Sequence, residues 1–323
     1  MSCAACGSAD RVIRLDLGDG FQLAECTRCG LVSTSPALPG SEIGRYYPES
    51  YYGEKNRRFH PVLESLIRVF RSRRCRAIEA FVPKGRIIDV GCGRGVLLGL
   101  MRDRGWETHG VEVSETAAHH AREILGLSVW VGEFADSPHP PASVDAVVIW
   151  HVLEHLLDPV AALAKAAEVI RPGGVLVVAV PNFESWQAGF SGRHWFHLDV
   201  PRHYHHFRTP VLRRLLEEHG FSVETVRHFS LEQNPYGWIQ SLLNRLGFRF
   251  NLLYDILKNE TARSEPHPIR AHPLQAALMF VALPAVAAVS GLLFLLEVAA
   301  RRGGTVEFYA RRPRSLPADA GKK

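Results

Sequence analysis

Glycines alternate with other residues in the segment Asp89-Val90-Gly91-Cys92-Gly93-Arg94-Gly95, which directly follows an apolar run. Glycine lets the backbone approach a ligand closely, and the free N–H groups at the start of a following helix attract a negative group. The segment therefore predicts a cofactor-binding turn. A dinucleotide-binding turn has its third glycine one position later, where this chain has Val96, so a nicotinamide cofactor is disfavoured.

Two acidic residues follow the glycine turn at positions suited to the same ligand. Glu112 ends the next strand-like run, about 20 positions after the glycines, where a carboxylate can accept hydrogen bonds from both ribose hydroxyls. Glu133 and Phe134 follow the third run and offer an acidic acceptor and an aromatic face for an adenine ring. All of these groups are expected at the carboxyl ends of strands, where open α/β sheets bind ligands.

Four cysteines near the N-terminus form two Cys-x-x-Cys pairs, a spacing typical of a four-thiolate zinc site. They are Cys3, Cys6, Cys26 and Cys29. Four thiolates close the coordination sphere, so the metal would be structural and would hold together a segment too small for its own core. A redox dithiol is the alternative, but it explains only one pair at a time.

Histidines gather in two places. His151-Val152-Leu153-Glu154-His155 matches the His-x-x-Glu-His pattern of one class of metalloprotease, and a packing role for Glu154 and His155 is the other alternative. The second cluster follows the fifth strand-like run and could be a metal patch, although its spacing dictates no coordination. Its members are His194, His197, His203, His205 and His206.

The elements that must position these residues alternate between strand and helix. Strand-like runs cover residues 86–90, 108–113, 129–131, 146–150 and 175–180, with helical segments between them, and two further strands are expected at 222–229 and 305–310. Repeated β-α units predict a parallel sheet with helices on both faces.

Composition is that of a globular protein: 323 residues, 46% hydrophobic and 22% charged, with a net charge of +5. The arginine clusters attract phosphate in lipid headgroups or in nucleic acid, so charge alone does not choose a partner. Cysteines rather than a charged and apolar leader follow Met1, and we expect a cytoplasmic protein, associated with the cytoplasmic face of the membrane.

Taken together, the motifs resemble those of class I S-adenosylmethionine (SAM) dependent methyltransferases. The matching segments are Asp89 to Gly95, Glu112, Val144 to Val148, His151 to His155, Asp158-Pro159 and Arg171-Pro172-Gly173-Gly174. The closest likeness is to ubiquinone-biosynthesis O-methyltransferases and to sugar methyltransferases with an N-terminal zinc module. The resemblance implies an α/β fold: a Rossmann-like seven-stranded sheet with an N-terminal zinc ribbon and an apolar helical insertion before the last strand.

The resemblance also implies roles for individual residues. For SAM binding they are Asp89, Gly91, Cys92, Gly93, Gly95, Glu112, Val113, Glu133, Phe134 and Trp150. His151 and His203 are the catalytic candidates, because a histidine beside the transferred methyl group could serve as a base. The acceptor would be bound by Tyr51, Tyr52, His194, Arg202 and His206, and Arg202 would suit a phosphate or carboxylate on it.

An uncharged run at residues 276–296 has the length of a membrane-spanning helix. If the strands at 222–229 and 305–310 pair in one sheet, both ends of the segment between them lie on the same side of the membrane. A single crossing of the membrane by this segment is therefore excluded. Pro284 would permit a kinked or hairpin insertion into one leaflet, aided by the amphipathic stretch 236–257. A buried helix or a dimer interface is the soluble alternative.

These signals divide the chain into six parts. They are a zinc ribbon (1–40), an aromatic and arginine-rich linker (41–80), the methyltransferase core (81–232), a membrane-associating insertion (233–303), the last core strand (304–312) and a basic tail (313–323). The core lacks the Asn-Pro-Pro-Tyr type of element found in the resembling enzymes that methylate base amines, so oxygen or carbon of a small or lipid-linked acceptor, glycan or quinone-like, is favoured. RNA methylation and a non-catalytic membrane-docking role remain as alternatives.

Overall fold

The computed structural model describes residues 2–46, 61–258 and 267–314, and a seven-stranded sheet forms its centre. The strand order is β10-β11-β8-β7-β4-β5-β6. These strands are β4 (Arg86–Val90), β5 (Glu107–Glu112), β6 (Ser128–Val131), β7 (Val144–Trp150), β8 (Ile170–Pro181), β10 (Ser222–Arg227) and β11 (Thr305–Arg311). β11 lies antiparallel between β8 and β10, and the other pairs are parallel. The expected Rossmann-like sheet is confirmed.

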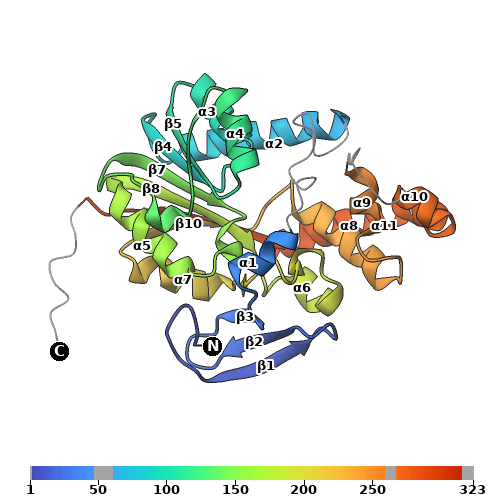
Figure 1. The fold of residues 1–323 in the computed structure, drawn as a ribbon. Coiled ribbons are helices and arrows are strands. Elements are labelled where there is room, and N and C mark those ends of the chain that lie inside the picture. Colours follow the sequence, from blue (N-terminus) through green and yellow to red (C-terminus); the bar gives the residue numbers. More distant parts are fainter. Residues whose placement is uncertain (1, 47–60, 259–266, 315–323) are drawn as a thin grey trace.

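Helices cover both faces of this sheet (Figure 1). They are α2 (Pro61–Glu79), α3 (Val96–Asp103), α4 (Glu115–Glu123), α5 (Pro159–Val169) and α7 (Thr209–Glu218). Alternation along β7 shows why: Val147 and Ile149 pack with α5 and α7, whereas Ala146 and Val148 pack with α2 and α3. A strand that is apolar on both faces requires such double cover.

Local capping sets where two of these helices begin. Asp158 precedes α5 and its carboxylate accepts a hydrogen bond from the Ala161 N–H at 2.9 Å, while Pro159 occupies the first turn. Ser114 does the same for α4, accepting from the Ala117 N–H at 3.3 Å. α4 therefore starts three residues after β5, whereas α5 follows β7 only after the 3-10 turn at residues 153–155.

The four cysteines lie in a small second sheet of order β1-β2-β3-β9. Its strands are β1 (Arg11–Asp16), β2 (Gln22–Cys26), β3 (Val32–Ser35) and β9 (His205–His206), and the short helix α1 (Gly40–Ile43) follows β3. We call residues 2–39 the cysteine module. The sequence predicted no strand at β3 or β9. Because β9 belongs to the core, the sheet of the module extends into the core.

The segment between β10 and β11 is helical and packs beside the sheet (Figure 1). It contains α8 (Asn234–Arg245), α9 (Leu252–Leu257), α10 (Pro268–Ala271) and α11 (Pro273–Ala299), and α6 (Trp186–Ser191) also contacts α8. Glu297 of α11 is buried and accepts hydrogen bonds from Trp238 Nε1 at 2.8 Å and Gln187 Nε2 at 3.1 Å. This contact ties the end of α11 to α8 and α6.

Two expectations about this segment are wrong. α11 continues through Pro284 as one helix, so the hairpin alternative is wrong, while a kinked insertion stays a prediction. The stretch 236–257 does not present one apolar face outward, because Trp238, Leu243 and Leu252 are buried within the protein. In the described part of the chain, α11 is the one helix long and apolar enough to cross a membrane, and 22% of its most apolar window is buried.

Candidate active site

A cavity of about 1210 Å³ opens at the carboxyl ends of β4, β5 and β7. The glycine turn forms its floor, and residues from α2, the 3-10 turns 153–155 and 196–198, and α9 complete its walls. Among the predicted site residues, those that line it are Asp89, Gly91, Cys92, Gly93, Glu112, Val113, Glu133, Phe134, Trp150, His151, Arg202 and His203.

The glycine turn is held open by Glu112. Gly91 has φ +65°, and a Cβ there would lie 2.5 Å from the Val152 side chain. The Gly93 N–H donates to Glu112 Oε2 at 2.8 Å and the Ser114 N–H to Oε1 at 2.9 Å. Each carboxylate oxygen retains a lone pair, so Glu112 can brace the turn and still accept hydrogen bonds from a ribose. Burial raises the pKa of this carboxyl group.

Asp89 and two arginines lie at the other end of the turn. Burial raises the pKa of Asp89 to about 7, against the opposing effect of Arg74 and Arg71. Arg74 donates to Glu232 at 2.8 Å, and its guanidinium lies 3.7 Å from the centre of the Trp150 ring. Both arginines belong to α2, whose arginine-rich sequence was the available signal, although helical spacing alone did not place them in the cavity.

Three predicted cofactor residues have a different environment from the one expected. Gly95 does not line the cavity; its Cβ position would lie 2.5 Å from Leu127, so glycine is required there by packing. The Cys92 side chain is buried beneath α3 and α4. Phe134 is 2% exposed and packs in the core, so its ring supports the cavity rather than offering a free face to adenine.

His151 directly follows β7 and has φ +53°, a conformation that few residues other than glycine adopt. Its Nδ1 lies 3.2 Å from Glu154 Oε1, and Nε2 is buried without a hydrogen-bond partner among the described residues. Burial lowers the pKa of His151 to about 4 and raises that of Glu154 to about 7. The ring is therefore neutral near pH 7.

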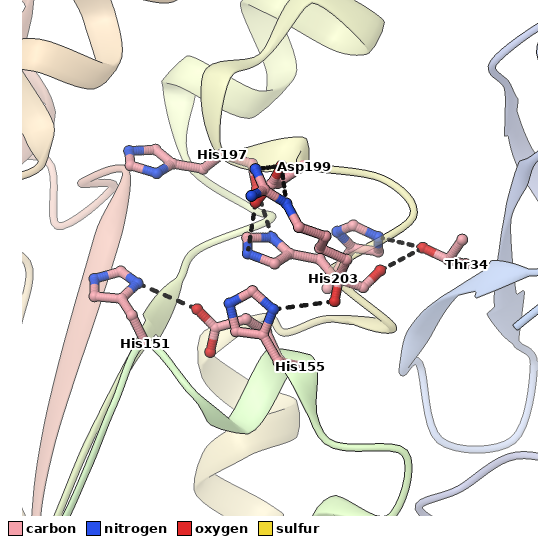
Figure 2. A network of polar contacts seen from close by, with 9 residues as sticks. Thr34, His151, His155, His197, Asp199 and His203 are labelled. Carbon is pink, nitrogen blue, oxygen red and sulfur yellow. Dashed lines mark hydrogen bonds and ion pairs between the residues drawn. The ribbon is translucent and has the colours of Figure 1, made fainter. Parts of the chain in front are cut away.

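Around His151, the rings of His203 and His155 form hydrogen bonds with backbone carbonyl groups (Figure 2). His203 Nδ1 lies 2.9 Å from the His197 carbonyl oxygen, and His155 Nδ1 lies 3.0 Å from that of Arg202. Ligand atoms of Glu154, His155 and His203 lie within 4.8 Å of one another, a grouping that could hold a metal ion. His151 is outside this group, and residues 153–155 form a 3-10 turn rather than an α-helix, which does not fit the metalloprotease alternative.

The predicted acceptor-binding residues are only partly brought together. Arg202 lines the cavity, but Asp199 already pairs with it at 2.5 Å, so its charge is balanced within the protein. His194 lies outside the lining, and so does His206, which is buried against the cysteine module. Tyr51 and Tyr52 lie outside the described residues.

Sequence reasoning missed an aromatic wall opposite the glycine turn. Phe196 is 5.2 Å from Tyr236 and 5.4 Å from Tyr254, measured between ring centroids, and Phe196 and Tyr254 line the cavity. Asn251 and Gln233 line the same region. Most of these residues belong to the helical segment after β10, which the sequence assigned to membrane contact alone.

The four cysteines of the module converge. Cys3 Sγ lies 3.5 Å from Cys29 Sγ, and Cys6 Sγ lies 3.6 Å from Cys26 Sγ. All four sulfur atoms lie within 4.8 Å of one another. Zn–S bonds of about 2.3 Å in a tetrahedron place sulfur atoms about 3.8 Å apart, so this geometry is close to that of a four-thiolate site.

Comparison with known proteins agrees with the fold. A family model for methyltransferase domains matches residues 62–226, half of the chain. A probable SAM-dependent methyltransferase from Mycolicibacterium smegmatis is 34% identical over 142 residues, 43% of this chain and 52% of the relative. A ubiquinone biosynthesis O-methyltransferase from Alkalilimnicola ehrlichii is 37% identical over 105 residues, 30% of this chain and 42% of the relative. The chain thus spans about half the length of these two relatives.

Solved structures show the same fold. A putative sarcosine dimethylglycine methyltransferase from Galdieria sulphuraria superposes with a TM-score of 0.52 at 15% identity, covering 84% of this chain and 98% of that one. The glycine turn, the carboxylate of Glu112 and the family match over residues 62–226 agree with one another. The chain belongs to the class I SAM-dependent methyltransferase family.

Proposed function

We propose that this enzyme transfers a methyl group from SAM to an oxygen or carbon atom of a small or lipid-linked acceptor, such as a glycan or a quinone-like compound. One observation carries the proposal: His151 lines the cavity and its buried Nε2 has no hydrogen-bond partner among the described residues. A base at this position suits an oxygen or carbon acceptor, which must lose a proton during transfer.

Glu154 prepares His151 for this role. With the Nδ1–H donating to Glu154 Oε1, the lone pair of the neutral ring is on Nε2 and faces the acceptor. The pKa of about 4 keeps His151 unprotonated at neutral pH, and the Glu154 carboxyl group stabilises the imidazolium that forms on proton uptake.

The residues around the glycine turn fit SAM. SAM supplies an electrophilic methyl group on its sulfonium sulfur. Glu112 would accept hydrogen bonds from the ribose hydroxyls, Asp89 would pair with the amino group, and Arg74 lies where it could meet the carboxylate. In the transfer the bond from methyl to acceptor forms as the bond from methyl to sulfur breaks, and the acceptor proton passes to His151 Nε2.

The acceptor side of the cavity favours an apolar, flat group. Phe196 and Tyr254 offer ring faces or edges, and the charge of Arg202 is balanced by Asp199. An uncharged aromatic or quinone-like ring meets these walls at a lower desolvation cost than an anion does. Two of the similar proteins are named as ubiquinone biosynthesis O-methyltransferases, which supports this acceptor class.

Helix α11 would bring the enzyme to a lipid surface. Its buried residues, Ala276, Met279, Val286, Ser290, Phe294 and Glu297, follow one face. The opposite face is apolar yet exposed, with Val281 at 81%, Leu292 at 60% and Leu295 at 63%. Because α11 packs by one face on α8, we expect it to lie in the membrane surface with Arg301 and Arg302 at the headgroups rather than to span the bilayer.

The cysteine module would bind one structural zinc ion through Cys3, Cys6, Cys26 and Cys29. Metal analysis of the purified protein should give one equivalent of zinc that is lost in Cys26→Ser.

Calorimetry with SAM tests the cofactor site. Glu112→Ala should weaken SAM binding at least tenfold, since it removes the ribose acceptor and the brace of the turn. Glu107→Ala, an exposed carboxylate of the same strand, is the matched control and should bind as the wild type does. Equal affinity in the two variants would disprove the assignment.

A methylation assay tests the base. With catechol as the probe acceptor and labelled SAM, His151→Ala should reduce kcat by about 10²-fold or more, in the range of one general base. Because the pKa of His151 is about 4, the wild-type rate should show no loss from His151 protonation between pH 8 and pH 6. Unchanged turnover in His151→Ala would rule out the base. Methylation of RNA in place of catechol, with steep salt dependence of binding, would favour the RNA alternative.

A further inference from the structure

Strand β9 connects the cysteine module to the wall of the candidate active site. It pairs antiparallel with β3, with Val32 opposite His206 and Ser33 opposite His205. The residues just before β9, Arg202 and His203, line the cavity. β9 thus pairs with the module through hydrogen bonds, and the residues that precede it in the chain line the cavity.

Thr34 lies at the centre of this connection (Figure 2) and is 2% exposed. Its N–H donates to the Tyr204 carbonyl at 2.9 Å. Its Oγ1 donates to the His203 carbonyl at 2.6 Å and lies 3.1 Å from His206 Nε2. This residue of the module therefore contacts three neighbouring core residues, two through its side chain and one through its backbone.

The hydroxyl group of Thr34 has one hydrogen, and this fixes the roles of its partners. The His203 carbonyl can only accept, so the hydroxyl hydrogen is directed to it. The hydroxyl oxygen must then accept from His206, which requires the His206 tautomer with hydrogen on Nε2. Both contacts exist only while β3 keeps this register beside β9.

On its other side the same segment meets the proposed base. The Tyr204 N–H donates to the Glu154 carbonyl at 2.8 Å, and His155 Nδ1 lies 3.0 Å from the Arg202 carbonyl oxygen. Glu154 in turn contacts His151. Hydrogen bonds thus connect Thr34, through residues 202–204, to Glu154 and His155.

We propose that Thr34 of the cysteine module is a positioning residue for methyl transfer: its hydroxyl holds the 203–206 segment so that His203 and the Glu154–His151 pair keep their places in the cavity wall. The proposal rests on the proposed function for the role of His151. It gives the module a part in the reaction, although none of its cysteines lines the cavity.

Replacement of the hydroxyl group separates positioning from general stability. Thr34→Val keeps the shape and removes both contacts, and Thr34→Ser restores the hydroxyl. Thr27→Val is the matched control, because Thr27 is in the same module, is exposed, and donates only a long bond of 3.4 Å to the Asp10 carbonyl.

For the zinc-loaded full chain, Thr34→Val should lower kcat for catechol roughly tenfold or more, with the KM for SAM within about twofold of wild type and with zinc content unchanged. Amide exchange should rise in residues 150–156 and 203–206 but not at the glycine turn. Thr34→Ser should recover most of the rate, and Thr27→Val should behave as wild type.

Loss of rate in Thr34→Ser equal to that in Thr34→Val would overturn the role of the hydroxyl, as would a Thr34→Val rate within twofold of Thr27→Val. If Thr34→Val does not fold, nitrogen NMR of His206 in the wild type still decides the contact: a hydrogen on Nδ1 instead of Nε2 refutes it. A wild type that leaves catechol unmethylated refutes the acceptor class, and the exchange pattern then decides the positioning role on its own.

Discussion

The two segments added to the methyltransferase sheet are joined to it in different ways. Three cysteines of the N-terminal module, Cys3, Cys26 and Cys29, pack in the same core as the sheet. Glu25 of the module also pairs with Arg208 of the core at 2.8 and 2.9 Å. Helix α11 near the other end is attached along one face and keeps a broad apolar face in contact with solvent.

The difference shows that the groups an added segment leaves exposed or without a ligand indicate what it binds. The cysteine module shares polar contacts and apolar packing with the core, and its four converging thiols are the groups that a metal would satisfy. Helix α11 leaves apolar surface, which a lipid surface or another apolar partner would cover. The following experiments separate the two kinds of attachment, from the largest expected effect to the smallest.

Cys26→Ser should lower the free energy of unfolding by more than about 4 kcal/mol, because loss of a metal site also disturbs the core that the module shares. Thermal unfolding and zinc content measure this. Cys75→Ala, a buried cysteine of α2 outside the module, should cost less and should retain all of the zinc. A Cys26→Ser protein that unfolds like the wild type would show the module to be an independent appendage.

Glu297→Ala should lower the free energy of unfolding by about 3 kcal/mol, because it leaves Trp238 Nε1 buried without its acceptor and leaves Gln187 Nε2 with only the Asn234 carbonyl of its two acceptors. Glu297→Gln keeps one acceptor oxygen and should cost less. Urea unfolding with both variants tests whether this one network attaches α11. Similar stability of Glu297→Ala and wild type would mean that apolar packing on α8 is sufficient.

Leu292→Asp should weaken binding to anionic vesicles by about 2 kcal/mol, or more than tenfold, because it removes an exposed apolar side chain from the proposed lipid face. Its unfolding free energy should change by less than about 0.5 kcal/mol. Ile124→Asp, an equally exposed apolar residue after α4, is the control. Vesicle binding that is absent in the wild type or equal in both variants contradicts the membrane surface.

Tyr204→Phe should have the smallest effect, about 1 kcal/mol, since it removes one hydrogen bond of 2.8 Å from the Tyr204 hydroxyl to the Leu38 carbonyl. Zinc content should remain complete. Chemical denaturation resolves a change of this size, and a loss as large as that of Cys26→Ser would mean that this bond, rather than the metal, holds the module.

The sheet could be predicted from the sequence because its signals are local. Apolar runs such as 86–90 and 146–150 and the turn Asp89 to Gly95 depend on near neighbours, and each was found within two residues of its place. β9 could not be predicted, because a two-residue strand is defined by its partner, and its partner β3 is more than 170 positions away.

The candidate site shows the same limit. Glu112 could be assigned because it ends a strand, and strand ends converge. Arg74 and Tyr254 could not, since helical spacing gives the face of α2 or α9 but not the direction in which the helix lies across the sheet. His206 and Gly95 were assigned to ligands because of their residue type, whereas long-range packing determines their contacts.

The place of β11 between β8 and β10 has a consequence for synthesis of the chain. β10 is synthesised before the helical segment and β11 after it. The strand edges of β8 and β10 that pair with β11 therefore stay unpaired while residues 228–304 are synthesised. During this interval the apolar helix is already made but cannot yet be held in place by the completed sheet. β11 therefore completes the seven-stranded sheet only after α11 has been made, and early contact of α11 with a lipid surface would protect the nascent chain from aggregation until then.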